Sequence, residues 1–124
     1  MNILLDTHVV IWWYEDPTLL TADARKLIED RENALFLSPA VLWEISIKQS
    51  LKKLKIPESL IEKAIHDLIE IPITIKDTLA LKKLPLVHND PFDRILIAQA
   101  KVNDLFLMTR DKQIGKYDIR ILIA

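Results

Sequence analysis

The sequence predicts an α/β fold with a mainly parallel central sheet. Short apolar runs alternate along the chain with longer stretches whose apolar residues recur at helical spacing, a pattern typical of strand–helix–strand units. Half of the 124 residues are hydrophobic and 28% are charged, which is enough apolar material for one core. A chain of this length suits one compact domain, so we expect a single domain over residues 1–124.

The predicted elements follow from local patterns. We expect strands over residues 3–5, 34–37, 72–75, 105–108 and 119–123. Helices are expected over residues 8–15, 22–30, 58–69, 76–83 and 92–102, with a further helix beginning at Pro39. Ser38-Pro39 and Asp90-Pro91 each place a capping side chain before a proline at the first helical position, which predicts two helix starts.

The composition excludes several functional classes. The net charge of −1 rules out a polybasic protein that binds nucleic acid by bulk attraction. The chain has no cysteine, and therefore no disulfide, thiolate zinc site or cysteine nucleophile. Gly115 is its one glycine, so the glycine-rich phosphate loops of common nucleotide-binding proteins are excluded. No signal peptide and no apolar run near the roughly 18 residues of a membrane span are evident, so we expect a cytoplasmic protein that does not enter a membrane.

Four acidic residues occupy positions that predict a shared site. Asp6 and Asp111 follow predicted strands, whose carboxyl ends border a crevice in an open parallel sheet. Asp93 lies in the first turn of the helix that begins at Asp90-Pro91, and Glu44 interrupts an apolar helical stretch. Carboxylates brought this close repel one another unless a cation offsets them. An all-oxygen cluster without cysteine suits Mg²⁺ or Mn²⁺.

Each of these acids also has an ordinary structural interpretation. Asp6 and Asp90 stand where helix N-caps are expected, and Asp111 stands where a turn residue is expected. Asp93 would complement the dipole of its helix. Glu44 precedes Lys48 by four residues and so has the spacing of an exposed ion pair. Its apolar neighbours predict partial burial instead, and a partly buried carboxylate needs a partner.

The basic residues are unevenly distributed. Residues 48–55 hold four lysines and no acid, among them Lys48, Lys52 and Lys53, while Arg94 and Arg110 flank the predicted acidic site. These residues either form a solvated surface or bind phosphates beside a metal ion. The three histidines show no ligand spacing, so we expect no zinc site. The helix over residues 8–15 is apolar on more faces than one sheet covers, so its tryptophans either pack inside the monomer or meet a partner.

Four segments in register carry a resemblance to a known family. They are Leu4–His8, Leu42–Lys48, His88–Ala100 and Met108–Asp111. On these segments the sequence resembles the PIN-domain nucleases and, within them, the VapC-type toxins of bacterial toxin–antitoxin pairs. The resemblance implies a three-layer α/β/α sandwich and a ribonuclease that uses Mg²⁺ or Mn²⁺ to activate water. It also implies an antitoxin protein as partner and a homodimer.

The resemblance assigns roles to individual residues. It places Asp6, Glu44, Asp93 and Asp111 at the four acidic catalytic positions, with Asp6 and Asp93 as direct metal ligands. Thr109 matches the small hydroxyl residue that precedes the last acid in the family, and we expect Thr7 and Asp90 also to support the site. Asn103-Asp104 replaces a glycine that the family often has before the last of these strands, and asparagine tolerates the same backbone shape.

Two other functions fit parts of the sequence. A phosphatase of the haloacid-dehalogenase type also begins with a strand and an aspartate, but it needs a second acid two positions later, where this chain has His8. A PIN-fold interaction module without turnover would keep the fold. The presence of all four acids argues against that alternative.

Overall fold

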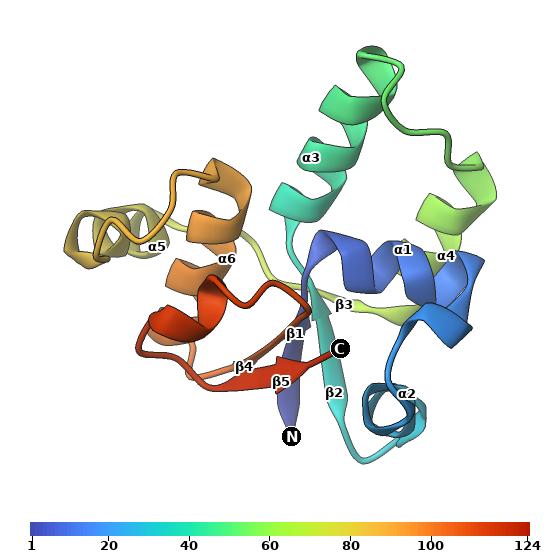
Figure 1. The fold of residues 1–124 in the computed structure, drawn as a ribbon, viewed down its shortest axis with the longest axis horizontal. Coiled ribbons are helices and arrows are strands. Elements are labelled where there is room, and N and C mark those ends of the chain that lie inside the picture. The colour runs from blue at the N-terminus through green and yellow to red at the C-terminus, as the bar shows by residue number, and fades with distance from the viewer.

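A five-stranded parallel sheet forms the centre of the structure, a computed structural model that describes residues 1–124 (Figure 1). The strands are β1 (Asn2–Leu5), β2 (Ala34–Leu37), β3 (Ile69–Glu70), β4 (Phe106–Thr109) and β5 (Ile121–Ile123). Their order across the sheet is β3-β2-β1-β4-β5, and every pairing is parallel. The predicted fold class is therefore confirmed.

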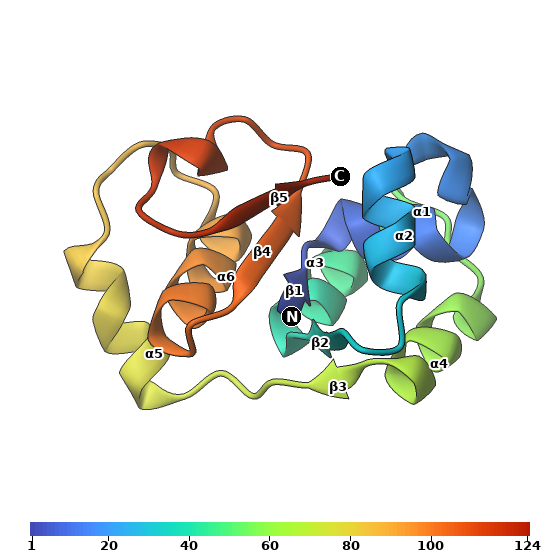
Figure 2. The ribbon, with the colours of Figure 1, turned by 90° about the horizontal axis from the view of Figure 1, so that it is seen from below.

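Helices cover the sheet from both sides. They are α1 (Thr7–Glu15), α2 (Ala22–Glu29), α3 (Pro39–Ser50), α4 (Glu58–Asp67), α5 (Ile75–Ala80) and α6 (Pro91–Val102), with 3-10 turns η1 (Pro17–Leu19), η2 (Leu81–Lys83) and η3 (Ile114–Lys116). In both views α5 and α6 lie on one side of the strands and α1 and α2 on the other (Figures 1 and 2). None of these helices has the length and apolar character needed to cross a membrane.

The strand order places a crevice between β1 and β4. The chain adds β2 and β3 on one side of β1, then crosses back to add β4 and β5 on the other side. Ligands bind at such a reversal in open α/β sheets, beyond the carboxyl ends of the strands. Leu5 pairs with Met108, and the Asp6 N–H donates to the Met108 carbonyl over 3.1 Å. The residues that follow β1 and β4 are therefore neighbours.

The two predicted cap-and-proline starts hold α3 and α6 at this edge. The Ser38 hydroxyl accepts from the Ala40 N–H over 3.1 Å. The Asp90 carboxylate accepts from the N–H groups of Phe92 and Asp93 over 2.9 and 3.0 Å. Both helices consequently begin beside the ends of β1 and β4, and α3 extends away from the sheet (Figure 1).

The core is continuous across the sheet. Thirty buried apolar residues form one cluster, which includes Ile3–Leu5 of β1 and Ile95–Ala98 of α6. The central strands are covered on both faces, which explains why they are apolar runs without alternation. Trp12 and Trp13 are half-buried against this cluster. The exposed apolar side chains lie elsewhere; on α3 and just after it, Trp43 and Leu51 are 59% and 58% exposed.

The prediction of the third strand was wrong. Residues 72–75 were expected to form it, but β3 is Ile69–Glu70, and α4 ends at Asp67 rather than at Ile69. Pro72 has no N–H to donate to the sheet, and the last sheet-like hydrogen bond runs from the Ile71 N–H to the Leu37 carbonyl over 2.9 Å. The apolar run before the proline fits helical and strand spacing alike, so periodicity could not separate the two.

Candidate active site

A pocket of about 380 Å³ opens at the carboxyl edge of the sheet, between β1 and β4. Five carboxylates line it: Asp6, Glu44, Asp90, Asp93 and Asp111. Its other lining residues are Thr7, His8, Trp12, Lys48 and Arg110. The structure thus brings together the four acids that the sequence singled out, although they come from four separate segments of the chain.

Asp6 combines a structural role with a place in the pocket. It is the N-cap of α1, and its Oδ1 accepts from the Val9 N–H over 3.0 Å. The residue is only 5% exposed. This burial raises the pKa of the Asp6 carboxyl, while hydrogen bonds from the Thr109 side chain and the Val9 N–H oppose the rise. Capping and membership of the acidic cluster are therefore compatible in one side chain.

Glu44 is held on both of its oxygens. The Thr7 hydroxyl donates to Oε1 over 2.6 Å, and the Lys48 ammonium donates to Oε2 over 2.7 Å. Glu44 is 6% exposed, whereas the Lys48 side chain is 39% exposed. The predicted ion pair is present, but it lies in the pocket wall rather than on an open surface. It supplies the partner that a buried carboxylate requires.

Asp93 experiences the repulsion of the cluster directly. Burial raises the pKa of its carboxyl to about 7, and the negative charges of Asp90, Asp6, Glu44 and Asp111 contribute to this rise in that order. Near neutral pH this group exchanges its proton readily. A cation bound in the pocket would favour the ionised form.

Asp111 is ordered by the turn that follows β4. Its backbone N–H donates to the Thr109 hydroxyl over 3.1 Å, and its Oδ1 accepts from the Gln113 N–H over 2.9 Å. Thr109 itself is fully buried and also hydrogen-bonds Asp6. One threonine side chain therefore ties the end of β1 to the end of β4.

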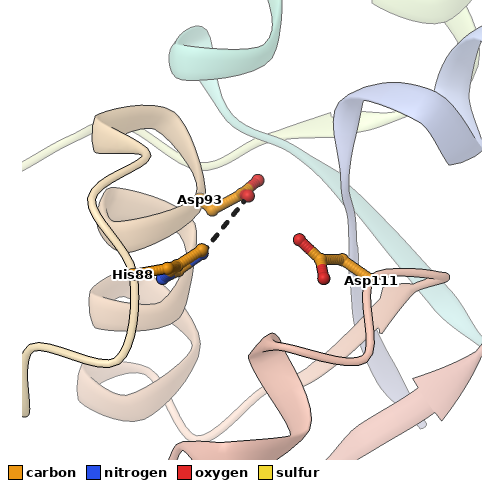
Figure 3. A group of neighbouring side chains, drawn as sticks. All are labelled: His88, Asp93 and Asp111. Carbon is orange, nitrogen blue, oxygen red and sulfur yellow. Dashed lines mark ion pairs between the residues drawn. The ribbon is translucent and has the colours of Figure 1, made fainter.

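His88 lies beside Asp93 and Asp111 at the edge of the pocket, a place that its sequence context did not predict. His88, Asp93 and Asp111 each offer a ligand atom, and these atoms lie within 4.8 Å of one another. Figure 3 shows the imidazole directed toward Asp93, and Nε2 lies 3.4 Å from Asp93 Oδ2. The histidines have no ligand spacing among themselves. The available signal was the position of His88 two residues before Asp90, the N-cap of the helix that carries Asp93.

The basic residues fall into two groups. Lys52 and Lys53 are exposed just beyond the C-terminal end of α3. Arg110 lines the pocket, but its guanidinium donates to the carbonyls of Leu19 and Ala124 and lies 4.4 Å from the centre of the Trp12 ring. This arginine therefore helps to build the pocket wall.

Arg94 does not line the pocket. Its guanidinium donates to the Pro85 carbonyl over 2.9 Å, to the Tyr117 hydroxyl over 3.0 Å and to the Leu81 carbonyl over 3.4 Å. These bonds account for its position beside the predicted site. Because its guanidinium bonds these protein groups, it does not point into the open side of the pocket.

The donor set fits a hard divalent cation. Carboxylate oxygens are the preferred protein ligands of Mg²⁺ and Mn²⁺. The pocket lining contains five carboxylates but only one lysine and one arginine, Lys48 and Arg110. Lys48 is already paired with Glu44. The other four carboxylates add to the rise that burial causes in the pKa of Asp93.

Comparison with known proteins identifies the family. The family model of the PIN domain matches residues 3–120, so the chain belongs to the PIN domain family. No curated protein matches the chain.

Solved structures share the fold at low sequence identity. One is VapBC2 from Rickettsia felis bound to a DNA fragment from their promoter, with a TM-score of 0.75 at 17% identity over 100% of this chain and 99% of that chain. Another is DNA-bound VapBC from Salmonella typhimurium, with a TM-score of 0.75 at 16% identity over 99% and 98%. A third is FitAcB from Neisseria gonorrhoeae, with a TM-score of 0.59 at 18% identity over 97% and 96%. These likenesses extend over nearly the whole of each chain.

The raised pKa of Asp93 predicts a pH dependence of stability. Because the folded state holds this proton up to about pH 7 and the unfolded state releases it near the usual aspartate value, folding binds a proton between these limits. The contribution of Asp93 to the free energy of unfolding therefore falls as pH rises from about 4 to 7. In urea titrations without metal, Asp93→Asn should gain stability relative to wild type by about 1–3 kcal/mol across this window.

Asp23→Asn is the matched control, since Asp23 also lies in the first turn of a helix but is exposed. Its stability difference from wild type should stay level with pH. If the stability difference between Asp93→Asn and wild type were also independent of pH, the raised pKa of Asp93 would be contradicted.

Proposed function

We propose that the protein is a Mg²⁺- or Mn²⁺-dependent endoribonuclease that acts as the toxin of a toxin–antitoxin pair. The convergence of Asp6, Glu44, Asp93 and Asp111 in one pocket of a PIN domain is the observation that carries this proposal. The chemistry of the donor set suits an ion that neutralises a phosphodiester. The VapBC and FitAcB structures with the same fold support the assignment to a toxin–antitoxin pair.

Asp6 and Asp93 are the proposed direct ligands of the cation. Asp6 is fixed through its cap on α1, and Asp93 sits in the first turn of α6, so both come from rigid elements. A divalent ion held there would lower the pKa of water and offset the negative charge that develops on the phosphoryl group. Asp90 contributes by holding the first turn of α6, where its carboxylate accepts from the Asp93 N–H.

Asp111 is the proposed residue that orients the attacking water. Each oxygen of Glu44 already accepts a hydrogen bond, one from the Thr7 hydroxyl and one from the Lys48 ammonium. Asp111 uses only Oδ1 within the protein, in its bond with the Gln113 N–H. Its second oxygen is available to accept from water in the pocket. Glu44 then acts as a fixed negative charge, and Thr7 and Thr109 keep the carboxylates in place.

Lys52 and Lys53 are the proposed contacts to the RNA backbone. They lie beyond the pocket, just after the helix that carries Glu44 and Lys48, and both are exposed. Lysines at this place bind phosphate as point charges and position a strand without reading its sequence. Lys48 forms an ion pair with Glu44, so we assign it to the pocket and not to the RNA contacts made by Lys52 and Lys53.

A cognate antitoxin and a second copy of the chain are the proposed protein partners. The exposed apolar side chains of Trp43, Ile47 and Leu51, on α3 and at its C-cap, provide surface suited to a protein contact. The acidic pocket suits a cationic side chain from an inhibitor, which would pair with the carboxylates.

Loss of one proposed ligand charge should abolish cleavage. We expect Asp6→Asn and Asp93→Asn each to reduce cleavage of single-stranded RNA at least about 100-fold, because each removes a charge that holds the ion. Gel-based cleavage assays with the purified chain should lose activity in EDTA and recover it with Mg²⁺ or Mn²⁺. Asp23→Asn should cleave like wild type. Undiminished cleavage in either ligand variant excludes that residue as a ligand, and inactivity of wild type with both metals favours an interaction module.

The lysine strip, Lys52 and Lys53, should govern the salt dependence of RNA binding. Replacing both with glutamine should weaken binding and reduce its log–log slope against salt by about one unit for each phosphate that the protein no longer binds. Lys82→Gln with Lys83→Gln makes the same charge change on exposed residues of η2, near α5, and should leave the slope unchanged. Fluorescence anisotropy with a labelled oligoribonucleotide measures both. Equal slopes for the two variants would show that Lys52 and Lys53 are ordinary solvated surface residues that do not bind RNA.

The association state tests the partners. Analytical ultracentrifugation of the isolated chain at tens of micromolar should give a dimer, and Trp43→Ser should shift it toward the monomer because it removes an exposed aromatic side chain. Addition of the product of an adjacent small reading frame should give a larger complex. A strict monomer that does not bind this product would refute both proposed partners.

A further inference from the structure

A chain of polar contacts leads from Arg94 to the carboxylate of Asp93. Arg94 Nη1 lies 3.0 Å from the Tyr117 hydroxyl, and this hydroxyl lies 2.9 Å from His88 Nδ1. At the other end of the imidazole, His88 Nε2 lies 3.4 Å from Asp93 Oδ2 (Figure 3). Four side chains from the loop before α6, from α6 itself and from the segment after η3 therefore form one line that ends in the acidic pocket.

The hydrogen-bonding capacities of these groups fix the tautomer of His88. A guanidinium can only donate, so the Tyr117 oxygen accepts from Arg94. His88 Nδ1 is the remaining partner of this hydroxyl, which therefore donates its own proton to Nδ1. The neutral imidazole then carries its proton on Nε2. The donor of His88 faces Asp93.

The contacts are buried, and Arg94 at their outer end is fixed by backbone carbonyls. Tyr117 is 4% exposed, and the His88 side chain is 14% exposed. His88 Nε2 is inaccessible to solvent and has no hydrogen-bond partner at ordinary distance. Arg94 is anchored by the carbonyls of Pro85 and Leu81. Nε2 lies 3.4 Å from Asp93 Oδ2 without making a hydrogen bond, so an ordinary N–H···O bond needs a closer approach of about 0.5 Å and better alignment of the N–H with that oxygen.

We infer that Arg94, Tyr117 and His88 form a positioning relay that presents the Nε2–H of His88 to Oδ2 of Asp93. The relay rests on the proposed function, in which Asp93 is a metal ligand. It would fix the rotation of the Asp93 carboxylate through Oδ2 and leave Oδ1 free to bind a cation. Outer residues that orient a ligand in this way strengthen metal binding, and their loss typically costs about 10–100-fold in affinity.

Direct binding of a metal by His88 is the competing assignment. The cluster of His88, Asp93 and Asp111 has ligand-like spacing. Such binding would require the proton on Nδ1, donated to the Tyr117 oxygen. That oxygen already accepts from Arg94, and its own proton would then have no acceptor. The two assignments differ in the protonated nitrogen, which can be measured.

The tautomer is read from ¹⁵N NMR of the imidazole in the metal-free protein, at about pH 8 where free histidine is neutral. We expect the Nε2–H form for His88 in wild type. Tyr117→Phe removes only the hydroxyl and should give a mixture of tautomers. Tyr14→Phe is the matched control, since it removes a tyrosine hydroxyl that bonds Asp67 over 3.0 Å, between α1 and α4. It should retain the wild-type signal. An Nδ1–H form in wild type would overturn the relay.

Calorimetric titration with Mn²⁺ measures the effect on the ligand. Tyr117→Phe and His88→Leu should each raise the dissociation constant about tenfold or more, whereas Tyr14→Phe should not change it. His88→Gln keeps an N–H donor near the position of Nε2 and should stay within about threefold of wild type. Electron spin echo spectra of bound Mn²⁺ should show no coordinated histidine nitrogen. A coordinated nitrogen, or unchanged affinity in Tyr117→Phe, would overturn the relay.

The two proposals fail in different ways. Absence of Mn²⁺ binding by wild type would refute the proposed metal site and, with it, the role of the relay in metal binding. Normal binding by wild type with unchanged binding by His88→Leu would refute the relay alone.

Discussion

The mutual repulsion of five carboxylates in one pocket of about 380 Å³ is the constraint on which the rest of the site depends. Free side chains would move apart, and the fold prevents this by fixing the acids to separate elements. Asp6 caps α1, Asp90 caps α6, and Glu44 is bonded by Thr7 and Lys48. Burial, together with the nearby negative charges, raises the pKa of Asp93 to about 7. A site built in this way would be stabilised by a bound positive charge.

The same arrangement links stability to function. Four of the seven buried polar or charged residues belong to this region: Asp6, Thr7 and Glu44 line the pocket, and Thr109 hydrogen-bonds Asp6. Burial of charge in a crowded acidic site costs folding free energy, which the surrounding apolar core must offset. A divalent ion or a cationic partner side chain would relieve part of this cost. Sites of this kind commonly trade stability for activity.

Local chemistry accounts for what was predicted correctly. The starts of α3 and α6 follow from Ser38-Pro39 and Asp90-Pro91, because capping involves only neighbouring backbone groups. The strand before Asp6 was recognised because a run buried on both faces is apolar throughout. β3 was misplaced because its residues lie in an apolar run of ambiguous period. His88 and Arg94 were misjudged because their partners, Asp93 and Tyr117, are fixed by packing between segments.

The sequence by itself determined the class of fold, the two cap-and-proline helix starts and the identity of the four acids, since each depends on residue type and on near neighbours along the chain. The tertiary structure decided which oxygens accept hydrogen bonds, which basic residues face solvent and which histidines lie at the site. The Thr7–Glu44 bond joins residues 37 positions apart, and the His88–Tyr117 bond joins residues 29 positions apart. Contacts of this range depend on how β1, α3, α6 and the segment after η3 pack together, and no local pattern in the sequence specifies that packing.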